Sequence, residues 1–256
     1  MKRTVALVGA TGGAGTTRLC VEVAALLAHA GRDVAVLDAA FATQGLARHA
    51  PGRIDPDVTA LLTDADVDLP DALVDHPTDL AGRLALCPAY APFERRARAK
   101  TADAAERFED LIAEAAREFD HVLVDTPPVA ANQAVAAANA VERVALVAPA
   151  TERGADAVQR ARGRLADVGA TAETVVATRA TDDDQPVDAA DAVVPANGDS
   201  APASAPDLDA EFSPAVARAA EALVAAELEF EFPTEGVLNA AREEYVPDEY
   251  VPDSLS

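Results

Sequence analysis

The feature that most constrains the fold is a loop rich in glycine that joins a short apolar run to a helix-forming segment. The apolar run covers residues 4–8, the loop covers residues 9–17, and helix-forming residues continue as far as Gly31. At a strand-to-helix junction, glycines let backbone N–H groups surround a phosphate at the helix N-terminus. The sequence therefore predicts a strand, an anion-binding loop and a helix, in that order.

Strand and helix patterns alternate along most of the remaining chain. Further strands are predicted at 33–37, 121–124, 143–147 and 174–177, and further helices at 101–118, 130–140, 152–168 and 213–227. Alternation of this kind predicts a parallel sheet with helices on both faces. We therefore expect an α/β fold of three layers, doubly wound, with a mostly parallel sheet flanked by helices.

Composition divides the chain into one main domain and an acidic remainder. A chain of 256 residues is long enough for one sizeable core. Residues 181–256 hold 19 acidic side chains against 2 basic ones. Large apolar residues are scarce over 195–210, which we expect to form a flexible acidic surface loop. The predicted domain comprises 1–194 and 211–227, and 228–256 form an acidic C-terminal tail.

The charge balance and the cysteines indicate the environment of the protein. A net charge of −23 with only two lysines keeps a surface hydrated in molar salt, which is typical of extreme halophiles. Cys20 and Cys87 have no spacing for zinc or for a redox pair, and the N-terminus has no secretory apolar region. No charge-free apolar run reaches the roughly 18 residues that would span a membrane. We expect a soluble, cytoplasmic protein.

The glycine loop resembles the deviant Walker A motif of the ParA/MinD family, SIMIBI-class P-loop ATPases whose pattern is GKGGxGKT followed by Ser or Thr. Residues 119–128 look closely like the Walker B strand of that family, which ends in an aspartate, here Asp125, followed by Thr-Pro-Pro. The resemblance covers about residues 2–180 and indicates a divergent, haloarchaeal-type member. It implies ATP or ADP with Mg²⁺ as cofactor, with Thr17 and Asp125 holding the magnesium.

The resemblance also implies which residues contact the nucleotide and the attacking water. Asp38 matches the first carboxylate of an Asp-x-Asp motif after the second strand, and is the candidate catalytic residue. Thr178 and Arg179 fall where the family often has an asparagine and an arginine near the base. The residues expected to bind the nucleotide are Gly12, Gly13, Ala14, Gly15, Thr16, Thr17 and Arg18.

Three positions depart from the family pattern. Thr11 replaces the lysine that reaches across the dimer interface, and Thr16 replaces the lysine on the β- and γ-phosphates. Ala40 replaces the second carboxylate, which helps to position the attacking water. A charge-assisted hydrogen bond is worth about 1.5–3 kcal/mol, so losing one weakens binding roughly 10- to 150-fold. Hydrolysis suffers more, because the charge of the transition state loses its counter-charge.

The expected function is therefore a ParA/MinD-like nucleotide-binding protein or pseudo-ATPase that regulates or scaffolds, with weak or absent ATP hydrolysis. One alternative is an active ATPase in which Arg18, or an arginine of a second subunit, replaces the lysine. Another is an NAD(P)-binding Rossmann-like protein, because the loop also reads GxxGxxG, although the chain has no Tyr-x-x-x-Lys pair. A site that binds no cofactor at all is also left open.

The expected partner is an unidentified protein, and a homodimer is left open because the family forms nucleotide-sandwich dimers. Nucleic-acid binding is not expected, because the basic runs at 95–100 and 160–164 are offset by nearby carboxylates and molar salt screens phosphate contacts. Membrane binding is not expected either, because the acidic tail lacks a basic amphipathic helix.

Overall fold

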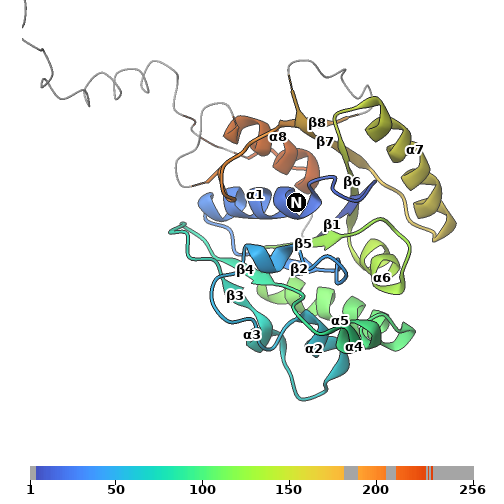
Figure 1. Cartoon of the computed structure of the whole chain (residues 1–256). Coiled ribbons are helices and arrows are strands. Elements are labelled where there is room, and N and C mark those ends of the chain that lie inside the picture. Colours follow the sequence, from blue (N-terminus) through green and yellow to red (C-terminus); the bar gives the residue numbers. More distant parts are fainter. Residues whose placement is uncertain (1–3, 182–189, 206–211, 229, 231, 233–256) are drawn as a thin grey trace, which may run out of the picture.

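Helices and strands alternate along the computed structural model, which describes residues 4–181, 190–205, 212–228, 230 and 232 (Figure 1). The strands are β1 (Thr4–Gly9), β2 (Val34–Asp38), β3 (Val74–Asp75), β4 (Leu84–Cys87), β5 (His121–Thr126), β6 (Arg143–Pro149), β7 (Thr174–Ala180) and β8 (Ala192–Pro195). The helices are α1 (Thr16–His29), α2 (Val58–Thr63), α3 (Leu69–Ala72), α4 (Phe93–Arg98), α5 (Ala102–Glu118), α6 (Asn132–Ala140), α7 (Glu152–Asp167) and α8 (Ser213–Val224), with a 3₁₀ helix η1 (Leu46–Arg48). The predicted strands and helices are confirmed, whereas the short elements between residues 46 and 98 and strand β8 had not been predicted.

The strands form one eight-stranded sheet in the order β3-β4-β2-β5-β1-β6-β7-β8. Within the described part of the chain, only β3 pairs antiparallel to its neighbour. Strand β1 lies between β5 and β6. In the Rossmann order 3-2-1-4-5-6, by contrast, the first strand pairs with the second. Because β5 lies between β1 and β2, the Walker-B-like strand ends directly beside the glycine loop.

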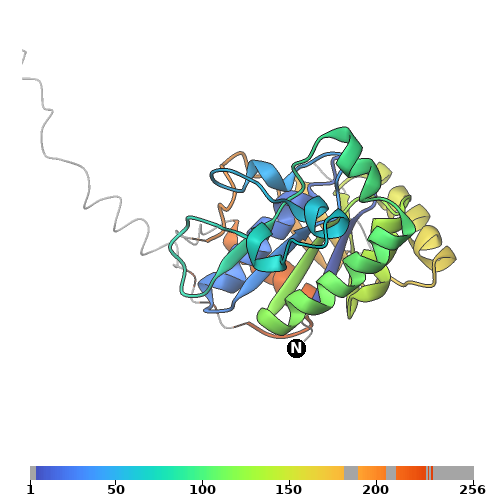
Figure 2. The ribbon, with the colours of Figure 1, turned by 90° about the horizontal axis from the view of Figure 1, so that it is seen from below.

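Helices cover both faces of the sheet. Successive residues of a strand point to opposite faces, so each strand contributes side chains to the core on either side. In β1, Val5 and Leu7 belong to the core formed with α1 and α8, whereas Ala6 and Val8 belong to the core formed with α5, α6 and α7. Figure 1 shows α1 and α8 on one side of the sheet, and Figure 2 shows α5, in green, crossing the other. The expected three-layer fold is therefore confirmed. None of the described helices is long and apolar enough to cross a membrane.

Residues 203–205 of the segment predicted as a flexible loop pack on α1, whereas Ala196 and residues 198–200 are exposed. Ser204 and Ala205 are fully buried. The backbone N–H groups of Ala203 and Ser204 each donate to Oε2 of Glu22 at 2.9 Å. Ser204 and Ala205 are thus buried and not at the surface, because small residues that lack apolar bulk are held here by a buried acceptor. Residues 206–210, and the predicted tail from 233 onward, lie outside the described residues.

Candidate functional site

The glycine loop turns from β1 into α1 at the carboxyl end of the sheet. Gly13 and Gly15 have φ angles of 74° and 84°, which glycine adopts without a steric penalty. Gly15 precedes α1 directly, and no side chain caps this end of the helix. The first N–H groups of α1 and the positive end of the helix dipole therefore favour an anion in the loop.

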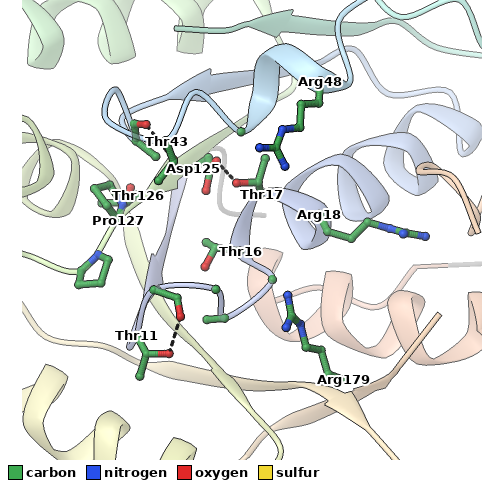
Figure 3. A pocket seen from close by; sticks show the side chains of 18 of the residues that line it. Thr11, Thr16, Thr17, Arg18, Thr43, Arg48, Asp125, Thr126, Pro127 and Arg179 are labelled. Atoms are coloured by element: carbon green, nitrogen blue, oxygen red, sulfur yellow. Dashed lines mark hydrogen bonds between the residues drawn. The ribbon is translucent and has the colours of Figure 1, made fainter. Parts of the chain in front are cut away.

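Thr17 and Asp125 meet beneath this loop, although 108 residues separate them in the sequence. The register of β1 and β5 places Asp125 opposite Leu7, close to the start of α1, where Thr17 lies. Oγ1 of Thr17 donates a hydrogen bond to Oδ2 of Asp125 at 2.6 Å (Figure 3). A hydroxyl and a carboxylate are oxygen ligands of the kind that Mg²⁺ takes beside substrate phosphates and waters. The two residues predicted to hold magnesium are thus brought together.

Asp38 lies behind the cleft and does not line it. Its side chain is fully buried, and its two oxygens accept hydrogen bonds from the backbone N–H groups of Ala40, at 2.7 Å, and Ala89, at 3.1 Å. Burial, together with the neighbouring charge of Asp125, raises the pKa of Asp38 to about 8. Burial also raises the pKa of Asp125, to about 6. Because both oxygens of Asp38 hold the backbone that follows β2 and β4, the geometry gives its candidate catalytic role no support.

The cleft in front of these residues has a volume of about 430 Å³. Its walls are the glycine loop, the loop after β2, the end of β5 and Arg179. Among the described residues that line it, the arginines are Arg18, Arg48 and Arg179, and the acidic side chain is Asp125 alone. Because Arg18 is paired with Glu22, the balance in the cleft is Arg48 and Arg179 against Asp125. This balance is positive in a chain whose net charge is −23, and it favours an anionic ligand.

All the loop residues predicted to contact a nucleotide line this cleft: Gly12, Gly13, Ala14, Gly15, Thr16, Thr17 and Arg18. The three positions that depart from the family pattern, Thr11, Thr16 and Ala40, line it as well. Thr16 is directed toward the centre of the cleft in Figure 3. Thr16 and Ala40, where the resemblance implied a lysine and a second carboxylate, therefore lie in the wall of the cleft.

Arg18 is directed away from the centre of the cleft (Figure 3). Its Nε donates to Oε1 of Glu22 at 2.6 Å, and its Nη1 donates to the carbonyl oxygen of Asp199 at 2.7 Å. Its guanidinium also lies 5.9 Å from the centre of the Phe212 ring. Arg18 therefore links α1 to the segments before and at the start of α8. The geometry does not favour Arg18 as the substitute for a phosphate-binding lysine.

Two other arginines, Arg48 and Arg179, point into the cleft (Figure 3). Arg48 ends η1, and no sequence motif marks it; the available signal was an arginine on the loop after the second strand, which also carries Arg53. Arg179 follows Thr178, whose Oγ1 donates to the carbonyl oxygen of Ala14 at 2.6 Å and so ties β7 to the glycine loop. The guanidinium groups of both arginines are thus brought to the loop by segments remote from it in sequence.

Comparison with known proteins identifies solved structures that have a similar fold. No family model and no curated protein sequence matches the chain. Solved structures do match: MinD of Pyrococcus horikoshii with Mg-ADP has a TM-score of 0.66 and 20% identity, over 77% of this chain and 82% of that one. MinD in the MinC:MinD complex of Aquifex aeolicus has a TM-score of 0.69 and 19% identity, over 91% and 100%. A ParA family ATPase of Chlorobium tepidum has a TM-score of 0.63 and 19% identity, over 77% and 84%.

The fold and the glycine loop together define a P-loop α/β protein. Its fold is that of the MinD and ParA ATPases, as the resemblance in the two motifs had implied. At such low identity the likeness concerns the fold, and the function has to be argued from the residues of the cleft.

Proposed function

We propose that this chain is a ParA/MinD-like nucleotide-binding protein that binds ATP or ADP with Mg²⁺ and hydrolyses ATP weakly or not at all. The observation that carries the proposal is the contact of Thr17 with Asp125, at 2.6 Å, beneath an uncapped helix N-terminus in a positive cleft. Phosphates, a divalent cation and a hydroxyl–carboxylate pair complement one another chemically. The structure of Pyrococcus horikoshii MinD contains Mg-ADP, which supports the same ligand class here.

Weak hydrolysis is expected because the cleft lacks a carboxylate to orient water and a positive charge at Thr16. Among its described lining residues, Asp125 is the only carboxylate, and its hydrogen bond to Thr17 directs it to the magnesium position. Ala40, where the family has a carboxylate, offers no group to orient water. Thr16 supplies no positive charge to stabilise the transition state. The expected protein therefore binds nucleotide as a ligand that sets its conformation, with little turnover.

Calorimetric titration with ATP and ADP, with and without Mg²⁺ in molar KCl, tests the proposal. The wild-type protein is expected to bind both nucleotides and to bind them more tightly with Mg²⁺. Thr17→Ala removes one metal ligand, so Mg²⁺-dependent affinity is expected to fall by roughly 10-fold or more, at 1.5–3 kcal/mol for a hydrogen bond to a charged group.

Thr11→Ala is the matched control for that titration. Thr11 lies in the same loop, but its hydroxyl donates only locally, to the carbonyl oxygen of Gly12 at 3.2 Å. The affinity of this variant is expected to equal that of the wild type. If the wild-type protein binds no nucleotide up to millimolar concentrations, the proposal fails.

An active ATPase is the second candidate, because Arg48 and Arg179 point into the cleft and bring positive charge that the glycine loop lacks. Turnover by the purified protein in molar KCl that Asp125→Ala abolishes would favour this candidate over a pseudo-ATPase. The strand order offers no such support for NAD(P) binding, since β5 separates β1 from β2.

The proposed role is regulatory or scaffolding, through a protein partner. A site that holds nucleotide but hydrolyses it slowly is suited to a persistent conformational state that another protein recognises. The Aquifex aeolicus MinD is part of a complex with MinC, which shows that this fold presents partner surfaces in that protein. We propose a cytoplasmic location, and leave a homodimer open, with no nucleic-acid or membrane contact.

A further inference from the structure

We infer that Arg48 supplies the positive charge to the terminal phosphates of the nucleotide, in place of the lysines that the glycine loop lacks. The inference rests on the proposed function, because it concerns a ligand of the same cleft. Arg48 belongs to η1, on the loop after β2, so the phosphate contact would come from a segment outside the glycine loop. Arg18, the nearer residue in sequence, is engaged with Glu22 and Asp199.

The loop that carries Arg48 is fixed against α1 and against the segment that follows β4. A Cβ atom built on Gly45 would lie 3.0 Å from Oγ1 of Thr17, so the backbone of this loop closely approaches the predicted magnesium ligand. Nε2 of Gln44 donates to the carbonyl oxygen of Ala91 at 3.0 Å. Leu46, in the first turn of η1, is fully buried against the core formed with α1. These contacts leave Arg48 at the rim with its side chain directed inward (Figure 3).

The positions of the two inward-pointing arginines assign them to different parts of a nucleotide. In Figure 3 the guanidinium of Arg48 lies on the side of Thr17 and Asp125, where magnesium would bridge the terminal phosphates. Arg179 lies on the opposite side of the loop, where a Cβ atom built on Gly15 would be 3.7 Å from its Nε. Arg48 is therefore placed for the terminal phosphate, which ATP has and ADP lacks.

The chemistry of arginine suits this task. Arg48 is exposed, and it forms no ion pair with another residue in the described part of the chain. Its planar guanidinium can donate two parallel hydrogen bonds to one phosphate. Because Arg48 is on η1, that contact would add a link from this loop to the terminal phosphate, which ADP lacks. The cleft would thereby distinguish ATP from ADP without hydrolysing either.

Calorimetric titration of Arg48→Ala, Arg48→Lys and wild-type protein with ATP and with ADP tests this assignment. Arg48→Ala is expected to weaken ATP binding by about 10- to 150-fold, as for a lost charge-assisted hydrogen bond, and ADP binding by less. Arg48→Lys keeps the positive charge but not the planar guanidinium that donates two parallel hydrogen bonds. Its affinity for ATP is therefore expected to lie between those of the wild type and Arg48→Ala. Circular dichroism and thermal unfolding confirm that each variant is folded.

Arg53→Ala is the matched control, because Arg53 is an exposed arginine outside the cleft that pairs with Asp55. Its affinities for ATP and ADP are expected to equal those of the wild type. If wild-type protein binds ATP and Arg48→Ala binds it equally well, this inference is wrong and the proposed function stands. If Arg48→Ala weakens ATP and ADP equally, Arg48 does not contact the terminal phosphate, and the assignment is likewise overturned. If the wild-type protein binds neither nucleotide, both proposals fall.

Discussion

Replacing Glu22 by glutamine is expected to lower the free energy of unfolding by about 1.5–3 kcal/mol, the usual contribution of a hydrogen bond to a charged group. Glu22 is 1% exposed and lies in the middle of the buried face of α1. Its carboxylate accepts hydrogen bonds from Nε of Arg18 at 2.6 Å, from the backbone N–H groups of Ala203 and Ser204, and from Oγ of Ser204 at 2.6 Å. All of these partners donate to the carboxylate.

Glutamine has nearly the same shape, but it would place an NH₂ group against one of these donors. At the Oε1 position the NH₂ group would face Nε of Arg18, and at the Oε2 position it would face the N–H group of Ser204, so either way one donor loses its acceptor. The Arg18 guanidinium would also lose its counter-charge. Denaturant unfolding followed by circular dichroism measures the change. Limited proteolysis provides a second measurement, because residues 203–205 are expected to become accessible when α1 no longer holds them.

Glu109→Gln, on the exposed face of α5, is the control for charge removal alone. A surface substitution of this kind is expected to change stability by less than about 0.5 kcal/mol. If Glu22→Gln is as stable as Glu109→Gln, the carboxylate is not what fastens this segment to α1. That result would contradict the hydrogen-bond network described here.

The sequence was sufficient to predict the strands and helices that show a local pattern of residues. Residues 5–8 are apolar without interruption because both faces of β1 are covered, and the glycines after them specify the turn into α1. Thr17 and Asp125 were found because each belongs to a motif whose spacing the fold preserves. The short elements between residues 46 and 98 have no such pattern, since short strands and helices derive their stability mainly from tertiary packing.

The directions of side chains were the least predictable part of the site. Arg18 was assigned to the ligand because it adjoins the loop in sequence, yet Glu22, one turn further along α1, attracts it away from the cleft. Glu22 is a carboxylate within an otherwise apolar helix face, and this was the sign in the sequence that it needs a buried partner such as Arg18. Arg48 could not be assigned, because its position in the wall of the cleft depends on the path of the whole loop after β2. Such contacts are made by tertiary structure and leave no local spacing in the sequence.

Restoring the two missing groups is expected to turn this cleft into a hydrolytic site. Thr16→Lys alone should tighten ATP binding by about 10- to 150-fold, because it adds a charge-assisted contact where Thr16 now faces the centre of the cleft. The double variant Thr16→Lys with Ala40→Asp adds a carboxylate at a lining position where it could orient water. Its turnover is expected to exceed that of the wild type by roughly 10²–10³-fold, the scale of a single preorganised electrostatic contact in a transition state.

Thr43→Lys is the control that separates position from charge, because Thr43 also lines the cleft but belongs to the loop after β2. A lysine there adds the same charge without reaching through the glycine loop, so it is expected to leave turnover unchanged. Calorimetry gives the affinities, and phosphate release in molar KCl gives the rates. If Thr16→Lys leaves ATP affinity unchanged in a protein that binds ATP, the glycine loop does not hold the phosphates. If affinity rises but the double variant releases no phosphate, binding and hydrolysis are separable in this fold, and the wild-type chain lacks more of the catalytic geometry than Thr16 and Ala40 account for.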